Sequence, residues 1–357
     1  MVAGSEESGL KNQRNNIAKD TLVSRGFSFV PNDKSYLINK IDCYIIKTII
    51  GELHMKHLII CNTHAGHGKE AKAIAEEAFK GLDFEIYETV DQRSCIGYLR
   101  SYFKDHKEPT RVYACGGDGT LHEVANGLVG VPNAELALYA CGTGNDFAKC
   151  YGGQDKFLDF KKLINGKATP IDITKIESPS ITEPWYSINV VNFGFDAIVG
   201  AKGNENKKKG LKDPYGFTHA IVPALLHGRF NKATIYADGE NLNGEKFLLG
   251  SFSQGQYVGG EWHAAPKSDN TDGLLDVCVC KTMTFLGLMT KLFGAYHDGK
   301  HIDNPKLAKK IVYRRSKEAM ILAPQDIDVC VDGEMIRGNE FRCTCMPKAL
   351  KFVIPEE

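Results

Sequence analysis

Glycines mixed with hydroxyl, amide and carboxylate side chains occur in three stretches of the chain, and this mixture suits phosphate binding. The densest stretch, GGDGTLHE at 116–123, follows the apolar run RVYAC and opens a segment of helical apolar spacing. Glycines let the backbone approach a bulky anion, and a helix N-terminus offers free N–H groups. Because a carboxylate in such a loop is costly without a bridging cation, Asp118 predicts Mg²⁺ nearby. A tight turn capped by Asp118 would explain one glycine, but not three.

The second stretch, GTGNDFA at 142–148, repeats this composition after another apolar run. Alone it is compatible with a strand-to-helix turn capped by Asn145 or Asp146. Beside the first stretch, a shared nucleotide site is the more economical interpretation. The third stretch, NTHAGHGK at 62–69, has neither Walker P-loop nor GxGxxG spacing. The histidines around it, His57 included, lack partners at zinc spacing and are expected to be polar loop residues.

The elements that carry these stretches follow from the apolar spacing. Between residues 55 and about 165, short apolar runs alternate with segments of helical periodicity. This alternation predicts a parallel sheet covered by helices, with ligands at the carboxyl ends of the strands. From about residue 166 strand-like segments dominate, which predicts a β-sandwich-like domain. The expected fold class is therefore α/β followed by all-β, with the active site in the cleft between the domains.

Four segments are expected along the chain. Residues 1–54 begin polar and aperiodic, and the pattern changes at Met55, so we expect a disordered extension or a natural start at Met55. A small N-terminal subdomain is the alternative. Residues 55–165 are expected to form the α/β nucleotide-binding domain and residues 166–345 a β-rich second domain. Residues 346–357 are expected to form a C-terminal strand that packs back on the first domain.

The composition excludes several classes of protein. The 357 residues contain 44 Lys and Arg against 44 Asp and Glu, which argues against a nucleic-acid binder that works by bulk charge. No apolar run is long enough for a membrane-spanning helix, and no signal peptide is recognisable. Eleven cysteines without a CxxC pair indicate free thiols in a reducing, cytoplasmic environment.

With these stretches the chain resembles the bacterial soluble diacylglycerol kinase and lipid kinase family, which is related to sphingosine and ceramide kinases. GGDGTLHEVANGL and GTGNDFA are similar to the family's signature segments. The later segments PID at 170–172, NFGFDA at 192–197, DGLLDV at 272–277 and VDGE at 331–334 extend the resemblance over residues 56–355. Thr63 and Cys141 stand where the family usually has proline, which bears on loop shape rather than on chemistry.

The resemblance implies that the glycine loops hold ATP and Mg²⁺. The residues that it assigns to the nucleotide are Asn62, Gly66, Thr89, Gly116, Gly117, Asp118, Gly119, Thr120, Glu123, Gly142, Thr143, Asn145 and Asp146. The family also carries a structural Mg²⁺, which maps by position to the side chains of Asp269 and Asp272 and the carbonyl of Leu274. A turn capped by carboxylates is the alternative at that position.

The resemblance places the catalytic base in the DGE segment. A lipid hydroxyl must lose a proton as it attacks, and a carboxylate is the usual acceptor. Asp332 and Glu334 are the family's candidates, and Asp118 is a rival. The Asp-Gly pair between two alternating strands is equally typical of a hairpin turn.

The expected function is an ATP- and Mg²⁺-dependent lipid kinase that converts diacylglycerol to phosphatidic acid. The alternatives are an NAD kinase-like enzyme, a kinase for sphingoid, ceramide or phosphatidylglycerol acceptors, and a non-catalytic nucleotide- or lipid-binding module. The expected partners are ATP and a membrane lipid reached by peripheral contact, with no nucleic acid and a homodimer left open. Lysines at 202–212 are candidates for the membrane contact, with a solvated loop as the alternative.

Overall fold

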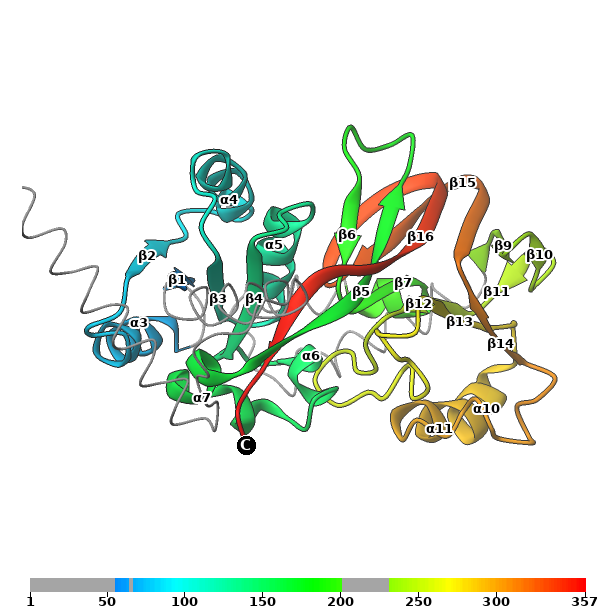
Figure 1. The fold of residues 1–357 in the computed structure, drawn as a ribbon. Coiled ribbons are helices and arrows are strands. Elements are labelled where there is room, and N and C mark those ends of the chain that lie inside the picture. The colour runs from blue at the N-terminus through cyan, green and yellow to red at the C-terminus, as the bar shows by residue number, and fades with distance from the viewer. Residues whose placement is uncertain (1–54, 64–66, 201–230) are drawn as a thin grey trace, which may run out of the picture. The chain divides into compact units, whose positions relative to one another are not determined.

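The computed structural model describes residues 55–63, 67–200 and 231–357, which form one compact unit (Figure 1). The expected N-terminal extension, Gly66 and the lysines at 202–212 lie outside the described residues. No helix among the described residues is long and apolar enough to cross a membrane.

The N-terminal half contains a parallel sheet with the strand order β2-β1-β3-β4. Its central strands are almost entirely apolar and buried, as expected for parallel strands covered on both faces. The strands are β1 (Lys56–Cys61), β2 (Phe84–Glu88), β3 (Thr110–Gly116) and β4 (Ala134–Ala140). The helical elements are α3 (Gly68–Ala78), α4 (Ser94–Asp105), α5 (Asp118–Leu128), α6 (Asp146–Lys149), η1 (Gln154–Phe157) and α7 (Phe160–Asn165).

The expectation of a polar loop was wrong for His57, which is the second residue of β1 and is buried. Its Nδ1 atom lies 2.9 Å from the hydroxyl of Tyr113 on the neighbouring strand β3. Burial lowers the pKa of His57 to about 4, so the imidazole is neutral near pH 7. Because the ring is neutral and hydrogen-bonded, it can be buried in the core. His57 can therefore belong to strand β1, which begins before the first aliphatic residue, Leu58.

The C-terminal half is rich in antiparallel strands, in the order β14-β13-β12-β7-β15-β16. The strands are β5 (Lys167–Glu177), β6 (Trp185–Ser187), β7 (Val190–Gly194), β8 (Asn231–Lys232), β9 (Thr234–Ala237), β10 (Glu240–Asn241), β11 (Lys246–Phe247), β12 (Leu249–Ser253), β13 (Leu275–Cys280), β14 (Ile311–Ser316), β15 (Glu318–Val331) and β16 (Glu334–Ile354). Between β13 and β14 the chain forms consecutive helical turns, α10 (Phe285–Gly287), the π-helical η2 (Leu288–Leu292) and α11 (Phe293–His297). The expected fold class, α/β followed by a β-rich domain, is confirmed.

The long strand β16 joins the two halves. It pairs antiparallel with β15 and β5, and near its end Phe352 pairs with Leu136 of β4 in parallel orientation. In Figure 1 this strand (red) runs from the β-rich half to the side of β4. Phe352 is fully buried, and its ring lies 5.1 Å from that of Phe147 in α6. The halves therefore share one continuous sheet, and the expected domain limits stay predictions.

The ten cysteines of the described residues are free thiols, and all but Cys150 are buried. Burial raises the pKa of the Cys141 thiol to about 11, which keeps it protonated near pH 7. Such thiols pack as small apolar side chains and are chemically inert.

Candidate active site

The first glycine loop connects β3 to α5 and leaves the first turn of α5 available to an anion. No side chain among the described residues caps this helix. Gly116 permits the loop to close, because a Cβ atom there would lie 2.2 Å from Thr120 Oγ1. Asn62, from the loop after β1, donates a hydrogen bond to the same hydroxyl at 3.3 Å. The uncapped N–H groups and the helix dipole make this turn a site for phosphate.

The two glycine loops pack directly against each other. A Cβ atom on Gly142 would lie 2.3 Å from Gly117 Cα, and one on Gly117 would lie 3.2 Å from Gly142 Cα. Gly117 is therefore required for contact between the loops, in addition to any approach of phosphate. Gly119 differs, since it is exposed and a Cβ atom there would meet nothing within 4 Å.

Asn145 holds the second loop together from the left-handed conformation, with φ 48°. Its side chain accepts a hydrogen bond from Gly142 N at 3.2 Å and donates to Gly142 O at 2.8 Å. It also donates to Ala140 O at 3.3 Å. Because both ends of the amide are occupied within the loop, the geometry favours a structural role for Asn145 over the predicted nucleotide contact.

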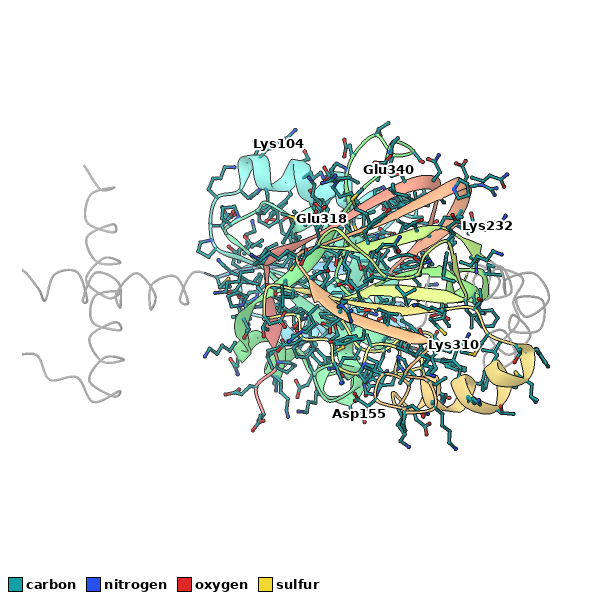
Figure 2. The ribbon with its side chains drawn as sticks, turned by 90° about the vertical axis from the view of Figure 1, so that its right-hand side faces the viewer. Lys104, Asp155, Lys232, Lys310, Glu318 and Glu340 are labelled. Carbon is teal, nitrogen blue, oxygen red and sulfur yellow. The ribbon has the colours of Figure 1, made fainter. Side chains whose placement is uncertain are left out.

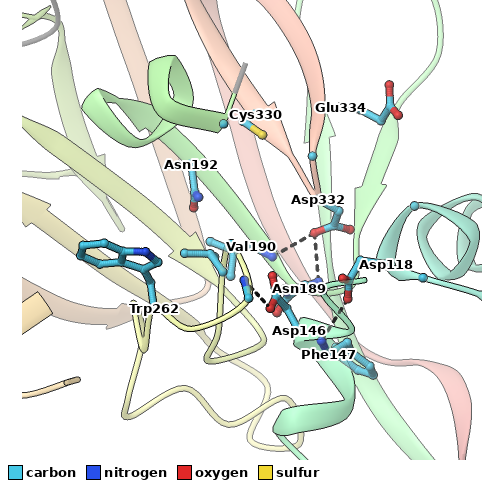
Figure 3. A pocket seen from close by; sticks show the side chains of 18 of the residues that line it. Asp118, Asp146, Phe147, Asn189, Val190, Asn192, Trp262, Cys330, Asp332 and Glu334 are labelled. Carbon is cyan, nitrogen blue, oxygen red and sulfur yellow. Dashed lines mark hydrogen bonds between the residues drawn. The ribbon is translucent and has the colours of Figure 1, made fainter. Parts of the chain in front are cut away.

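Asp118 and Asp146 form a carboxylate pair beside the loops (Figure 3). Asp118 accepts a hydrogen bond from Phe147 N at 3.2 Å, and Asp146 accepts one from Gly260 N at 2.9 Å and pairs with Lys149. Burial, followed by the charge of Asp146, raises the pKa of Asp118 to about 6. A divalent cation would relieve this unfavourable charge, and phosphate oxygens would complete its coordination. The pair therefore fits Mg²⁺ bound with a nucleotide.

The DGE segment forms a two-residue hairpin turn between β15 and β16. Asp332 has φ 48° and Gly333 has φ 96°, as a type I′ turn requires. The side chain of Asp332 is only 2% exposed and points toward the connection between β6 and β7. It accepts hydrogen bonds at 2.6 to 3.1 Å from the Ser187 hydroxyl and from the backbone N–H groups of Ile188, Asn189 and Val190. Figure 3 shows Asp332 beside Asn189 and Val190.

The same carboxylate contacts α5, the helix that begins at Asp118. His122 Nδ1 lies 2.9 Å from Asp332 Oδ2, and because a carboxylate only accepts, His122 carries its hydrogen on Nδ1. One turn later, Asn126 donates to Tyr186 O at 2.8 Å and accepts from Tyr186 N at 3.0 Å. Sequence reasoning did not assign roles to His122 and Asn126. Their i, i+4 spacing, which puts both on one helix face, was the available signal.

Glu334 is half-buried, and its hydrogen-bond partner in the described part of the chain is Gln92, whose Nε2 donates at 2.6 Å. Gln92 belongs to the loop after β2, which also contains the predicted residue Thr89. Next to it, Arg93 adopts φ 67° and its guanidinium lies 4.1 Å from the ring of Trp185. Sequence analysis missed Gln92 because an isolated glutamine in a loop carries no pattern.

The residues predicted for a structural Mg²⁺ form the turn that was the alternative. Asp269 Oδ1 accepts from Thr271 N at 3.0 Å. Asp272 accepts from Leu274 N at 2.9 Å and pairs with Arg315. The carbonyl oxygen of Leu274 accepts from Gln254 at 3.2 Å.

In this arrangement Asp272 is paired with the Arg315 guanidinium, as Asp146 is paired with the Lys149 ammonium, and the structural Mg²⁺ site stays a prediction. The buried Asp172 also holds this turn, because it accepts a hydrogen bond from Gly273 N at 2.6 Å.

One cavity of 1860 Å³ brings most of the other predicted residues together. Those that line it are Asn62, Thr89, Gly117, Asp118, Gly119, Thr120, Glu123, Gly142, Thr143, Asp146, Asp332 and Glu334. Gly116, Asn145, Asp269, Asp272 and Leu274 do not line it. The rest of the cavity is largely apolar, with walls that include Phe195, Val199, Leu249, Trp262, Leu288, Leu292 and Phe293.

Comparisons with known proteins match both halves of the chain. Residues 56–176 match the family model described as diacylglycerol kinase catalytic domain, and residues 189–354 match the YegS C-terminal NAD kinase beta sandwich-like domain. A "Probable lipid kinase YegS-like" from Cronobacter sakazakii is 30% identical over 256 residues, which cover 69% of this chain and 78% of that protein. One from Enterobacter sp. is 27% identical over 310 residues, 84% of this chain and 96% of that protein.

A solved structure of a diacylglycerol kinase from Bacillus anthracis has a similar fold. Its TM-score is 0.61 at 21% sequence identity, and the match covers 84% of this chain and 97% of that one. At this identity the likeness concerns the fold alone.

Proposed function

The chain belongs to the family of YegS-like lipid kinases, and on that premise we propose that it transfers the γ-phosphate of ATP to a lipid hydroxyl, with diacylglycerol as the substrate. The observation that carries this proposal is the 1860 Å³ cavity, which joins the phosphate loops and Glu334 to a largely apolar wall. Acyl chains would pack on that wall, and for this reason we favour a lipid over a polar acceptor such as NAD.

In this proposal the N-terminal half binds ATP. The first-turn N–H groups of α5 and the Thr120 hydroxyl face the phosphates, where the helix dipole favours negative charge. Asp118 and Asp146 would hold Mg²⁺, which supplies neutralisation of the phosphate charge when bound. Because phosphoryl transfer depends mainly on positioning and charge neutralisation, rigid loops are the essential contribution of this half.

We assign the general base to Glu334. It lines the cavity with one hydrogen-bond partner in the described residues, so it has lone pairs for the lipid hydroxyl. Glu334 takes the hydroxyl proton as the lipid oxygen attacks the γ-phosphorus; the bond from phosphorus to the β,γ-bridging oxygen breaks, and ADP leaves with that electron pair. Asp332, whose oxygens are occupied by Ser187 to Val190 and His122, positions the turn.

The C-terminal half would bind the lipid. The Trp262 ring packs edge-on against Phe293 at 4.8 Å, and both line the cavity with aliphatic neighbours. Asn192 also lines it, and its buried carbonyl oxygen has no hydrogen-bond partner among the described residues. An apolar wall with a few polar groups suits acyl chains that end in an ester and a hydroxyl.

Product identification tests the proposal. The protein is incubated with ATP, Mg²⁺ and diacylglycerol, sphingosine, ceramide, phosphatidylglycerol or NAD, and the products are identified by mass spectrometry. We expect phosphatidic acid from the wild type and from Glu340→Gln, a control on an exposed residue of β16 (Figure 2), and almost none from Glu334→Gln. Phosphorylated NAD without any phosphorylated lipid would refute it.

A further inference from the structure

The helical segment at 285–297 carries apolar side chains on two sides. Leu288, Leu292 and Tyr296, four residues apart, are buried and line the cavity. On the outside Leu286 is 71% exposed, the highest value among the large apolar side chains described, and Met289 is 40% exposed. A helix on a protein surface normally carries polar residues on its outer side. The segment includes a π-helical stretch, Leu288–Leu292, a feature that is frequent at functional sites.

The sequence around this segment is rich in lysine, and the exposed carboxylate next to it, Glu261, lies 3.9 Å from His297. Residues 281–297 contain no carboxylate, and residues 281–310 contain six lysines against two aspartates, whereas the whole chain is balanced. Both aspartates are neutralised, since Asp298 pairs with Lys300 at 3.1 Å and Asp303 with Lys267 at 2.6 Å. Lys310, labelled in Figure 2, donates to Thr282 O at 2.8 Å and so lies against the start of the segment.

We propose that the outer side of residues 285–297 docks on an anionic lipid bilayer. Exposed aliphatic side chains amid lysines are the composition of an interfacial membrane helix, whose apolar side enters the bilayer beneath the headgroups. The lysines then meet the anionic headgroups. Apolar side chains alone would be enough to bind a protein partner. The additional lysines favour an anionic bilayer over a protein.

This inference rests on the proposed lipid kinase function, because an enzyme that phosphorylates a membrane lipid must contact the bilayer. The membrane-facing Leu286 and the cavity-lining Leu288 belong to the same short segment. Docking would therefore bring the apolar wall of the cavity to the bilayer, and acyl chains could enter without crossing water. The segment is thus both the wall of the lipid site and the contact with the membrane.

Vesicle flotation of the full chain tests the docking without any turnover. We expect binding to vesicles of phosphatidylcholine mixed with phosphatidylglycerol, weaker binding to phosphatidylcholine alone, and a loss with added salt. Leu286→Glu should lower the partition coefficient onto anionic vesicles by about tenfold. The substitution removes an apolar contact and adds a negative charge, which the anionic headgroups repel. The matched control is Ile74→Glu on α3, where the side chain is 49% exposed, and it should bind as the wild type does.

Kinetic measurements on dispersed and on membrane-bound diacylglycerol test the docking proposal separately from the proposed kinase function. Leu286→Glu should phosphorylate a dispersed short-chain diacylglycerol as the wild type does, and lose activity only on diacylglycerol in anionic vesicles. If Leu286→Glu floats like the wild type, or if it instead abolishes a dimer seen by light scattering, the docking proposal is wrong. Vesicle binding that is sensitive to Leu286→Glu, without phosphorylation of either substrate, would support the docking and overturn the proposed function.

Discussion

The two carboxylates of the DGE segment, Asp332 and Glu334, differ in burial and in hydrogen bonding, and we therefore assign them different roles. Asp332 is buried and accepts hydrogen bonds from the β6–β7 connection and from His122. Glu334 is half-buried and has Gln92 as its partner in the described residues. The sequence could name both as bases but could not rank them, because their partners lie more than a hundred residues away.

At Asp332 we expect a cost in stability. In Asp332→Asn an amide nitrogen would face N–H donors such as Val190 N, which leaves them unpaired in a buried site. The free energy of unfolding should fall by about 2–4 kcal/mol. Urea denaturation measures this, with Glu334→Gln as the control that should change it by less than about 0.5 kcal/mol. Equal stability of the two variants would mean that Asp332 does not hold the turn.

Because of Asp118, both the stability of the chain and its affinity for nucleotide should depend on pH. Its pKa is raised to about 6, so the folded chain holds this proton more tightly than the unfolded chain does. The stability from this group is therefore fully present below the ordinary pKa near 4 and is lost as the pH rises through about 6.

Affinity for Mg-ATP should change in the opposite direction, because the cation needs the charged carboxylate. Calorimetry should show about tenfold weaker Mg-ATP binding one pH unit below this pKa than well above it. Asp118→Asn should bind weakly at every pH. A wild-type affinity that does not vary between pH 5 and 8 would argue against a cation on Asp118.

At the scale of elements, the glycine loops were predictable because each follows an apolar run and precedes helical spacing. Their contact was not predictable, since Gly117 and Gly142 meet only when β3 and β4 are neighbours. The same limit applied to the turn at 269–274. There Arg315, from another strand, pairs with Asp272, one of the two carboxylates predicted to bind a metal.

The loop geometry makes Gly119 a cleaner probe of the phosphate site than Gly117. Gly119→Val adds a side chain whose Cβ meets no atom within 4 Å, at a residue that lines the cavity. We expect ATP binding to weaken by about tenfold or more at nearly unchanged thermal stability. Gly117→Val should lower the melting temperature, because its Cβ meets the backbone of Gly142. Normal ATP affinity in Gly119→Val would exclude phosphate from the first turn of α5.

For the whole molecule, the fold class was predictable from the order of elements. A C-terminal strand that packs back on the first domain was expected at residues 346–357, but the strand that it pairs with, and its continuity with the rest of β16, were not predictable. The order of apolar runs distinguishes a parallel sheet from a β-rich domain. The pairing of Phe352 with Leu136 joins residues far apart in the chain, and no local pattern reports it. The site depends on this joining, because Glu334 opens β16 and Asp118 follows β3.

The shared strand predicts that the halves unfold together. Phe352→Ala removes a fully buried ring from contact with Phe147 and should cost about 3–5 kcal/mol. Circular dichroism and tryptophan fluorescence should report one common, lowered midpoint. Trp262 lies within the C-terminal half, and Trp185 lies where that half contacts Arg93 and His122, so the fluorescence follows the C-terminal half and this contact. Two separate transitions would show that β16 does not couple the halves, and Glu340→Ala, on an exposed residue of β16, serves as the control.

The central claim is that a lipid hydroxyl attacks ATP with Glu334 as its base. Transfer of label from γ-labelled ATP to diacylglycerol, measured in a single turnover at saturating ATP, tests it most directly. We predict that Glu334→Gln slows transfer by about 10²–10⁴-fold while its affinity for ATP stays that of the wild type. Glu340→Gln should transfer at the wild-type rate. Transfer by Glu334→Gln at the wild-type rate, or no label in the lipid with the wild type, would contradict the claim.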